Sequence, residues 1–407
     1  MNGIGLQDKA APPPTPPRKG RGEDSLALYI HWPFCVSKCP YCDFNSHVRD
    51  SVDQAVWLDA LLADMVHEAR LTAGRPLGSI FFGGGTPSLM PPATAAALIA
   101  AAQRHWGFAP GIEITLEANP SSVEAANFAD LAAAGVNRVS LGLQALDDAT
   151  LKFLGRAHKV DESLSALATA QSHFSRVSID LIYARPDQTV AQWEAELSRA
   201  IGFGTTHMSL YQLTIEPGTR FATDVAKRQW TPLDDDSAAD LYAATQAQTG
   251  AAGLPAYEIS NHAAPGQESR HNLTYWRYQD YVGIGPGAHG RRGGMATTRH
   301  KKPENFLNAV ARHASGLQIE DVLDAPTQAT EALLMGLRLR EGVDISALSD
   351  RFAVDSGDLI DFGAVDKLEA LGFINRVDQQ ISVTLDGFPL LDAILPQIVA
   401  IEPTPAA

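Results

Sequence analysis

Residues 29–44 read Y-I-H-W-P-F-C-V-S-K-C-P-Y-C-D-F and carry every cysteine of the 407-residue chain, namely Cys35, Cys39 and Cys42. Three closely spaced cysteines do not suit a disulfide framework, because secreted domains of that kind use more of them and in even numbers. The spacing C-x3-C-x2-C therefore indicates metal binding or thiol chemistry in a reducing compartment.

Three kinds of site could use these thiols. A structural zinc ion takes four ligands, and His47, five residues after Cys42, would complete a Cys3His set. A thioredoxin-type pair of Cys39 and Cys42 would leave Cys35 without a role. A [4Fe–4S] cluster usually takes four thiolates, so a cluster held by three leaves one iron open to a substrate or cofactor. The loop favours the open cluster, and zinc is the main alternative.

The composition excludes several classes of protein. Hydrophobic residues make up 45% and charged residues 19% of the chain, which allows a large core and predicts two or more units. The formal net charge of −15 argues against a nucleic-acid partner, since phosphate binding needs a basic face. We interpret the basic clusters at 291–292 and 300–302 as solvated loop charges.

The first 24 residues are interpreted as a proline-rich, disordered leader. They lack the apolar core of a signal peptide. In the whole sequence, no uninterrupted apolar run approaches the roughly 20 residues needed to span a bilayer. We therefore expect a cytoplasmic protein.

After the leader, strand-like apolar runs alternate with helical patterns. A helix is expected over 52–71, with Ser51 and Gln54 as a capping box and an apolar face of Leu58, Leu62, Met65 and Ala69. Alanine-rich helices are expected near 92–104, 122–134, 161–172 and 189–201. The expected strands are 26–31, 79–82, 112–116, 138–143, 177–182 and 207–213. Such βα repeats with right-handed crossovers predict a parallel sheet, either doubly wound or curved into a partial barrel.

Polar residues distinguish the doubly wound sheet from the partial barrel. At least one polar residue or segment lies at or after the carboxyl end of each expected strand. In chain order they are the cysteine loop, the glycine-rich segment 83–86, Glu117 with Asn119, Gln144, Asp180 and Gln212. A parallel barrel assembles its site from the carboxyl ends of many strands, whereas a doubly wound sheet concentrates ligands at one switch point. All six strands contribute here, which favours a partial (β/α)6 barrel over 25–230.

The pattern changes after about residue 230. Acidic residues 234–236 open a helix that is expected to reach about residue 252, and a stretch rich in aromatic residues, glycine and histidine follows. We interpret 231–325 as an extension of the barrel and 326–407 as a small C-terminal domain. That domain should contain a helix over 331–339, two more helices and a hairpin over 374–384. Helices followed by a β-wing suggest a winged-helix module, with a docking or packing role because the chain is acidic.

The cysteine loop and the segments after it resemble a known family. The C-x3-C-x2-C motif with Tyr41 before its third cysteine, followed one βα unit later by F-G-G-G-T-P (82–87), is similar to the radical S-adenosylmethionine superfamily. Y-I-H-W-P-F-C, G-G-G-T-P-S, E-A-N-P, L-G-L-Q and S-I-D-L-I-Y together resemble its oxygen-independent coproporphyrinogen oxidase group, from about residue 26 into the C-terminal domain. The resemblance implies a [4Fe–4S] cluster on the three cysteines, with S-adenosylmethionine on the open iron.

Carried over residue by residue, the resemblance also implies the contacts to S-adenosylmethionine. Asp180 and Gln144 can hydrogen-bond ribose hydroxyls or methionyl groups, and Arg156 can pair with a carboxylate through two hydrogen bonds. Any one of these residues alone is more often an ordinary polar residue of a barrel rim. The matching residues are Tyr29, Tyr41, Gly84, Gly85, Thr86, Glu117, Gln144, Arg156, Asp180, Gln212 and His289.

Two features distinguish the branches of this group. The oxidase branch has a further cysteine two positions after the third cluster ligand, where this chain has Phe44, and C-D-F-N (42–45) resembles the haem-chaperone branch, HemW. The segment H-N-L-T-Y-W (271–276), followed by V-G-I-G-P-G-A-H (282–289), also resembles that branch. His271 beside Tyr275 and Trp276 offers haem an axial ligand and an aromatic slot. The alternative role of His271 is a hydrogen-bonded loop cap.

The resemblance therefore implies a haem chaperone that binds the cluster, S-adenosylmethionine and haem, with no catalytic residue assigned. Its expected partners are haem-accepting proteins, including respiratory proteins at the membrane surface, and a homodimer stays open. The alternative function is that of a coproporphyrinogen III dehydrogenase in porphyrin biosynthesis, which would decarboxylate two propionates. A third alternative is a radical enzyme with an unrelated substrate.

Overall fold

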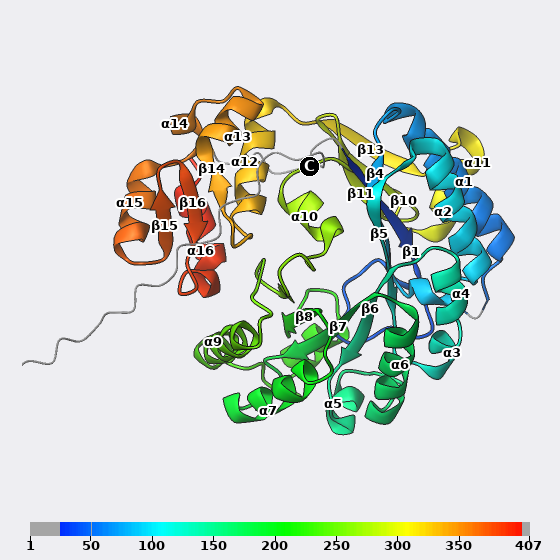
Figure 1. Ribbon diagram of the computed structural model, residues 1–407, viewed down its shortest axis with the longest axis horizontal. Helices are drawn as coiled ribbons and strands as arrows, with labels where there is room; N and C mark the ends of the chain where they lie inside the picture. Colours follow the sequence, from blue (N-terminus) through cyan, green and yellow to red (C-terminus); the bar gives the residue numbers. More distant parts are fainter. Residues whose placement is uncertain (1–24, 50, 401–407) are drawn as a thin grey trace, which may run out of the picture.

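A computed structural model of the chain describes residues 25–49 and 51–400, and the expected leader at 1–24 lies outside them. The main feature is one large sheet with the strand order β13-β12-β11-β10-β1-β4-β5-β6-β7-β8-β9 (Figure 1). Its six central strands are parallel and follow one another in chain order: β1 Leu26–Trp32, β4 Leu77–Gly84, β5 Phe108–Ala118, β6 Arg138–Gln144, β7 Arg176–Tyr183 and β8 His207–Gln212. A doubly wound sheet would reverse its strand order at a switch point, so the predicted partial barrel is confirmed.

Side chains alternate along these strands between an apolar outer face and a polar inner face. On β6, Arg138 and Ser140 face inwards, whereas Val139, Leu141 and Leu143 pack into the hydrophobic core beneath the helices. The register places inward residues of neighbouring strands side by side, with Glu117 of β5 next to Ser140 of β6. Glu117 and Asp180 lie within β5 and β7 rather than after them, so both carboxyl groups belong to the barrel interior.

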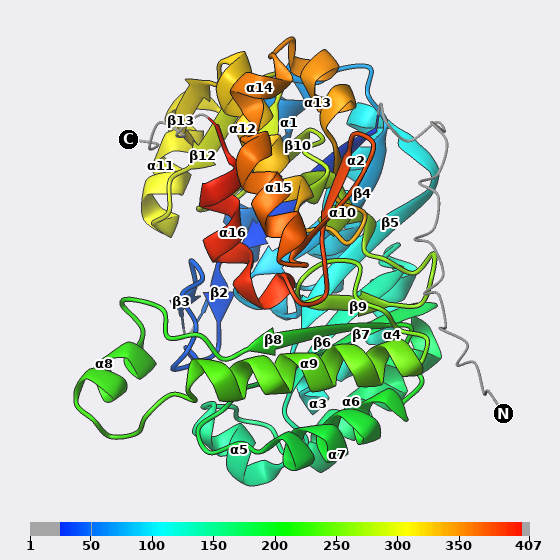
Figure 2. The ribbon, with the colours of Figure 1, turned by 90° about the vertical axis from the view of Figure 1, so that its left-hand side faces the viewer.

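Helices cover the outer face of the barrel in the connections between strands (Figure 2). They are α1 Gln54–Leu71, α2 Pro92–Trp106, α3 Ser122–Ala125, α4 Phe128–Ala133, α5 Asp148–Phe153, α6 Val160–His173 and α7 Val190–Ile201. The single helix predicted over 122–134 is wrong, because two short helices occupy it. The N–H of Asn127 bonds to the carbonyl of Glu124, which departs from the α-helical pattern and ends α3.

The start of α1 also differs from the prediction. Its N-cap is Asp53, whose carboxylate accepts hydrogen bonds from the N–H groups of Ala55 at 3.1 Å and Val56 at 3.2 Å. The predicted capping box of Ser51 and Gln54 is therefore wrong, because a nearer carboxylate already satisfies the free donors of the first turn. The predicted apolar face is shifted: Leu58 and Leu62 are partly buried, and the buried apolar residues are Trp57, Ala60, Leu61, Met65 and Ala69.

The sheet continues beyond the barrel at both edges. β9 Asn261–Ala263 pairs with β8, β10 Tyr281–Ile284 runs parallel to β1, and β11 His289–Arg292, β12 Met295–Arg299 and β13 Leu317–Val322 follow in antiparallel order. Helices α8 Arg220–Ala226, α9 Asp235–Ala251 and α11 Pro303–His313 lie outside it. Helix α9 begins within the acidic residues 234–236, as predicted, and Asp234 is its N-cap. Helix α10 Arg270–Trp276 carries H-N-L-T-Y-W and lies between the barrel and the C-terminal helices (Figure 1).

The last described part of the chain has a hydrophobic core of its own. Helices α12 Ala325–Gly336, α13 Ile345–Phe352, α14 Ser356–Leu359, α15 Phe362–Ala370 and α16 Leu391–Ile398 surround a sheet of β14 Val343–Asp344, β16 Gln380–Val383 and β15 Ile374–Val377. The predicted hairpin over 374–384 is present as β15 and β16. The helix predicted over 331–339 begins earlier, because the Asp324 carboxylate caps it by accepting the N–H of Thr327 at 2.8 Å. Within 25–49 and 51–400, no helix is long and apolar enough to cross a membrane.

Candidate functional site

The cysteine loop lies beyond the carboxyl end of β1. A short parallel pairing of β2 Phe34–Cys35 with β3 His47–Val48 closes the loop (Figure 2). The N–H of Phe221 in α8 donates to the carbonyl of Pro40 at 2.9 Å and holds the loop against that helix. All three cysteines are unbridged and partly exposed, so one loop presents three accessible thiols.

A chain of hydrogen bonds joins two of these thiols to the barrel. The Thr86 hydroxyl donates to Cys35 Sγ at 3.4 Å and accepts from Asn119 Nδ2 at 3.3 Å. Arg156 donates from Nη2 to Asn119 Oδ1 at 2.5 Å and from Nη1 to Cys39 Sγ at 3.4 Å. Three predicted elements, the glycine-rich turn, E-A-N-P and Arg156, thus meet at the cysteines. A guanidinium and a hydroxyl donor therefore point at two of the three sulfurs, where they can stabilise the negative charge of metal-bound thiolates.

The protonation of these groups is set by burial and by their neighbours. Burial raises the pKa of the Cys35 thiol, although the Thr86 hydroxyl partly opposes it. Burial also raises the pKa of the Cys42 thiol. Burial alone would lower the pKa of Arg156, but Tyr41 and Cys39 outweigh it, so the guanidinium stays charged. Metal binding at this loop should therefore release protons from thiols.

The glycine-rich turn after β4 has no room for side chains. Gly84 has φ of +113°, and a Cβ there would lie 2.6 Å from the His31 ring. A Cβ on Gly85 would lie 2.7 Å from the carbonyl oxygen of Phe34. The backbone can therefore pass close to the cysteine loop, and its Gly84 N–H donates to Glu117 Oε2 at 3.2 Å.

Two carboxyl groups lie together inside the barrel beneath this turn. Burial and, to a smaller extent, the nearby Asp180 raise the pKa of Glu117 to about 8, although the Gly84 N–H and Arg138 oppose the change. Burial also raises the pKa of Asp180, opposed by its bonds from Ser209 and from the Ser140 hydroxyl at 3.0 Å. At neutral pH the pair therefore holds at least one proton. Such a pair can both donate to and accept from a polar ligand.

Gln144 ends β6 in a left-handed conformation, with φ of +67°, which is uncommon for a residue other than glycine. The strand register shifts between Leu141 and Gln144. A Cβ on Gly142 would lie 2.7 Å from Gln144 Nε2 and 3.7 Å from Arg156 Nη2, so the glycine leaves room for both side chains. Backbone strain of this kind is concentrated at ligand sites.

Other predicted residues lie at different depths. Tyr29 faces the barrel interior, with its hydroxyl 2.9 Å from His31 Nδ1. Tyr41 packs 6.3 Å from the Phe221 ring, measured between centroids. His289 is exposed at the start of β11.

Gln212 is not brought together with the other predicted residues. Its Nε2 donates to the carbonyl of Ala238 in α9 at 3.0 Å. The alternation of β8 explains this placement, because the preceding Tyr211 is the residue that faces the Glu117–Asp180 pair.

His271, the haem-ligand candidate, lies inside the barrel. Its Nδ1 is 3.1 Å from the Ser79 hydroxyl, and its ring stacks on Phe81 at 5.0 Å between centroids. Its backbone N–H donates to Glu113 Oε1 at 3.2 Å. Burial lowers the pKa of the imidazole to about 4, which keeps it neutral and able to coordinate iron. The hydrogen bonds of His271 with Ser79 and Glu113 also agree with the alternative role of His271 as a loop cap.

The donor set fits a cluster better than a single ion. Among the described residues, no three His, Cys, Asp or Glu side chains are grouped as one metal ion would require. The zinc alternative needs His47, whose Nε2 is instead 3.3 Å from Asn45 Oδ1. Three thiols spread along an exposed loop, with sulfur-directed donors behind them, suit a larger iron–sulfur cluster.

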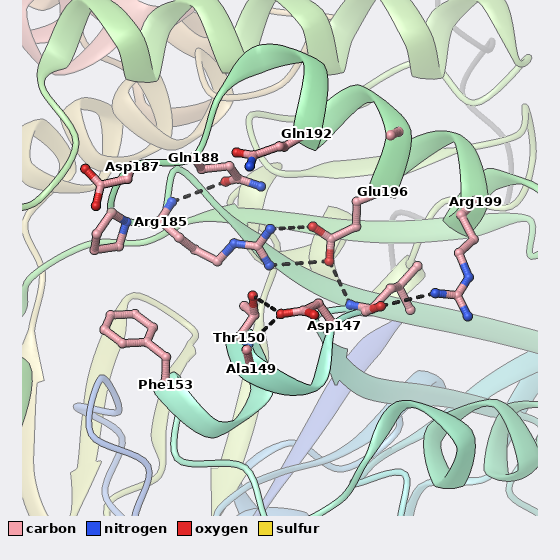
Figure 3. A pocket seen from close by; sticks show the side chains of 13 residues that line it. Asp147, Ala149, Thr150, Phe153, Arg185, Asp187, Gln188, Gln192, Glu196 and Arg199 are labelled. Carbon is pink, nitrogen blue, oxygen red and sulfur yellow. Dashed lines mark hydrogen bonds and ion pairs between the residues drawn. The ribbon is translucent and has the colours of Figure 1, made fainter.

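A cavity of about 670 Å³ lies outside this site, between α5 and α7 (Figure 3). Arg185 pairs with Glu196 in its wall, and Arg199 donates to the carbonyl of Leu146 at 3.1 Å. These charged groups already satisfy one another. The cavity is therefore not part of the candidate site at the cysteine loop.

Several residues of the interior were not identified from the sequence. They are Glu113, Arg138, Ser140, Ser209 and Tyr211. The polar residues at alternate positions of R-V-S-L-G-L-Q signalled an inward face on β6, and the same parity applies to β5 and β8. The sequence did not show which strands are neighbours, so these inward-facing residues could not be assigned to one site.

Comparison with known proteins agrees with this geometry. The radical SAM superfamily profile matches residues 29–200, and the HemN C-terminal domain profile matches residues 323–390. The chain is 41% identical over 289 residues to the haem chaperone HemW of Escherichia coli, covering 69% of this chain and 75% of that protein. It is 40% identical over 331 residues to the mitochondrial radical S-adenosyl methionine domain-containing protein 1 of Bos taurus, covering 79% and 75%.

One solved structure has a closely similar fold. Coproporphyrinogen III oxidase (HemN) of Escherichia coli superimposes with a TM-score of 0.79 at 23% identity, over 92% of this chain and 90% of that one. The likeness extends through both the barrel and the C-terminal unit.

Proposed function

Because the chain belongs to the radical S-adenosylmethionine superfamily, in the group of the HemN-type oxidases and HemW haem chaperones, we propose that it is a haem chaperone. It would bind a [4Fe–4S] cluster, S-adenosylmethionine and haem, and deliver the haem to acceptor proteins. The observation that carries the proposal is Phe44, which stands where the oxidase branch has a further cysteine and is 60% exposed at the cysteine loop. Relatives named haem chaperone HemW in three bacteria, at 35–42% identity, support it.

The cluster ligands in this proposal are Cys35, Cys39 and Cys42. When bound, a cluster with an open iron supplies one-electron reduction and a coordination position for S-adenosylmethionine. Thr86 and Arg156 would donate to the cysteine sulfurs and stabilise their negative charge.

The cofactor contacts in the proposal follow from the geometry of the barrel interior. Glu117, with its raised pKa, can give up its proton and accept hydrogen bonds from the methionyl ammonium group. The Asp180 carboxyl and the Gln144 amide can accept hydrogen bonds from ribose hydroxyls or donate to them. Tyr29, Tyr41, Gly84, Gly85 and His289 are further candidates around the mouth. Gln212 has the weakest support, because its amide is bonded to α9.

Haem is proposed to use His271 as its axial ligand. The imidazole is neutral and flanked by the aromatic rings of Phe81, Tyr29 and Tyr275. It is also 6% exposed, so haem can reach it only if α10 shifts within the barrel. The assignment of His271 as the axial ligand depends on this shift of α10. It can therefore be wrong without excluding a chaperone function.

The second candidate function is coproporphyrinogen III dehydrogenase, favoured by the HemN-like fold over nearly the whole chain. A cytoplasmic location is proposed for the chaperone, and the vertebrate relatives named as mitochondrial make the mitochondrion the alternative. The proposed acceptors are haem proteins, including respiratory ones at the membrane surface, and no nucleic acid.

The cofactor half of the proposal is tested by electron paramagnetic resonance. Protein reconstituted without oxygen and then reduced should show a cluster signal that changes when S-adenosylmethionine is added. The haem half is tested by titration, which should give a shifted Soret band that saturates. An unchanged cluster signal would remove the cofactor role, and the lack of a saturable Soret shift would remove the chaperone role.

A further inference from the structure

Asn45, three residues after the last cysteine, joins the cysteine loop to a distant part of the chain. Its Nδ2 donates to the carbonyl of Pro286 at 2.9 Å and to the carbonyl of Lys301 at 3.0 Å. These two acceptors lie 241 and 256 positions further along the chain, in the extension of the barrel. A primary amide has two N–H groups, and both are used here on backbone carbonyls, so the orientation of this side chain is fixed.

The backbone of Asn45 is held as well. Its carbonyl oxygen is 2.9 Å from His31 Nε2, and His31 Nδ1 is 2.9 Å from the Tyr29 hydroxyl. A carbonyl can only accept, so Nε2 carries the ring proton and Nδ1 accepts from Tyr29. Burial lowers the pKa of His31 to about 4, which keeps the ring neutral in this form. The cysteine loop is thereby connected to a side chain of the barrel interior.

The segment 285–289 lies close against these groups because it is rich in glycine. Gly287 has φ of +78°, and a Cβ there would clash with Asn45 Nδ2. A Cβ on Gly285 would clash with the carbonyl oxygen of His31. The glycine-rich turn after β4 packs on the same His31 ring. Three segments of the candidate site therefore meet at His31 and Asn45.

The segment 285–289 is also fixed from the opposite side. The N–H of Gly285 donates to Asp64 Oδ2 at 3.2 Å, and Asp64 is fully buried on α1. The segment ends at His289, one of the candidate contacts to S-adenosylmethionine. Asn45 therefore lies between the loop of cluster ligands and a segment that carries a candidate cofactor contact.

We propose that Asn45 is a positioning residue for the cofactor, because it holds the cysteine loop at one distance from the segment 285–289. The inference rests on the proposed function and gives Asn45 no contact with S-adenosylmethionine. A ligand that binds the open iron and also contacts the barrel extension needs both at a fixed spacing, since small misplacements forfeit binding energy. The three cysteines do not depend on the amide, so the loop should still hold a cluster without it.

The inference is tested with Asn45→Ala in the full chain, reconstituted without oxygen. This variant should keep the iron and sulfide content of wild type and the same electron paramagnetic resonance signal of the reduced cluster. The concentration of S-adenosylmethionine that changes the signal should rise roughly 10- to 100-fold, because two hydrogen bonds of the loop are lost. Asn45→Gln retains the amide donors and should recover part of the affinity.

Asn137→Ala is the matched control for the loss of an asparagine. Asn137 also bonds two backbone groups, because its Nδ2 donates to the carbonyl of Ile112 and its Oδ1 accepts the N–H of Ile114, each at 2.8 Å. Both partners belong to β5 and lie away from the cysteine loop. The control should therefore leave the affinity for S-adenosylmethionine unchanged.

A second variant displaces the amide without removing it. Gly287→Ala should push Asn45 Nδ2 away from its carbonyl acceptors and weaken cofactor binding to a similar degree. Gly266→Ala is its control, because Gly266 has φ of +81° and nothing within 4 Å of its Cβ position, so the backbone strain is matched without the clash. In metal-free protein, hydrogen exchange over 33–49 should be faster in Asn45→Ala and Gly287→Ala and unchanged in Gly266→Ala.

Failure of the inference and failure of the proposed function give different results. If the cluster of wild type showed no response to S-adenosylmethionine, the proposed function would fail, and the exchange rates alone would decide whether Asn45 holds the loop. A cluster of Asn45→Ala that responds at wild-type concentrations of S-adenosylmethionine would overturn the inference. That result together with a lowered melting temperature would show that Asn45 serves the fold alone.

Discussion

Replacing Glu117 by glutamine should stabilise the protein and weaken its cofactor binding. In the folded protein the Glu117 carboxyl keeps its proton up to a pKa of about 8, whereas its ordinary value is 4.5. Between these two values folding takes up a proton, so the stability of the wild type falls as the pH rises, and above about pH 8 it falls no further. Glutamine does not titrate and can still accept the Gly84 N–H.

The magnitude follows from the width of that pH window. Each pH unit between 4.5 and about 8 is worth roughly 1.4 kcal/mol, which gives at most about 5 kcal/mol. The carboxyl is partly solvated, so we expect about 2–4 kcal/mol. Glu117→Gln should therefore equal wild type in unfolding free energy near pH 4.5 and exceed it by this amount at pH 8.5.

The assay is urea unfolding of metal-free protein under anaerobic conditions, followed by tryptophan fluorescence at several pH values. The control is Glu194→Gln, at an exposed position on α7, which should show no pH-dependent difference from wild type. The same Glu117→Gln variant should bind S-adenosylmethionine more weakly, because it cannot carry the negative charge. A variant that is less stable than wild type at pH 8.5, or whose difference from wild type does not grow with pH, would refute the reasoning.

Three other predictions test the rest of the site. Changing Cys35, Cys39 or Cys42 to Ala should abolish a cluster of about four irons and four sulfides per chain, since three thiolates leave no spare ligand; stoichiometric zinc in protein purified without oxygen would show the zinc alternative to be right. Asp180→Ala should weaken S-adenosylmethionine binding by about 1–3 kcal/mol through loss of a buried hydrogen-bonding group, measured by isothermal titration. His271→Ala should weaken haem binding but keep the iron–sulfur absorbance, and unchanged haem affinity would reject the axial ligand alone.

The local features of the barrel could be predicted because they depend on short stretches of sequence. Each parallel strand is a run of alternating or continuous apolar residues, and the cysteine loop combines its three cysteines within eight residues. The start of α9 could be placed at the acidic residues 234–236, because acidic side chains are favourable in the first turn of a helix. The cap at Asp53 was missed because Ser51 and Gln54 offered an equally good local pattern.

The contacts between strands could not be read from the sequence. Ser140 binds Asp180 across 40 positions, and only the parallel register of β6 and β7 brings them together. His271 comes from α10, far along the chain, yet packs on Ser79 and Phe81 inside the barrel. Nothing local distinguishes a histidine inside the barrel from one in a solvated loop, and the same holds for a charged residue such as Arg138.

The most direct test of the chaperone function is a product assay with coproporphyrinogen. Protein with a full cluster is incubated without oxygen with coproporphyrinogen III, S-adenosylmethionine and a reductant, and the porphyrins are separated by chromatography. The same preparation is titrated with haem. The chaperone function predicts a saturable Soret shift and no protoporphyrinogen. Decarboxylation of coproporphyrinogen at many turnovers per cluster would contradict it.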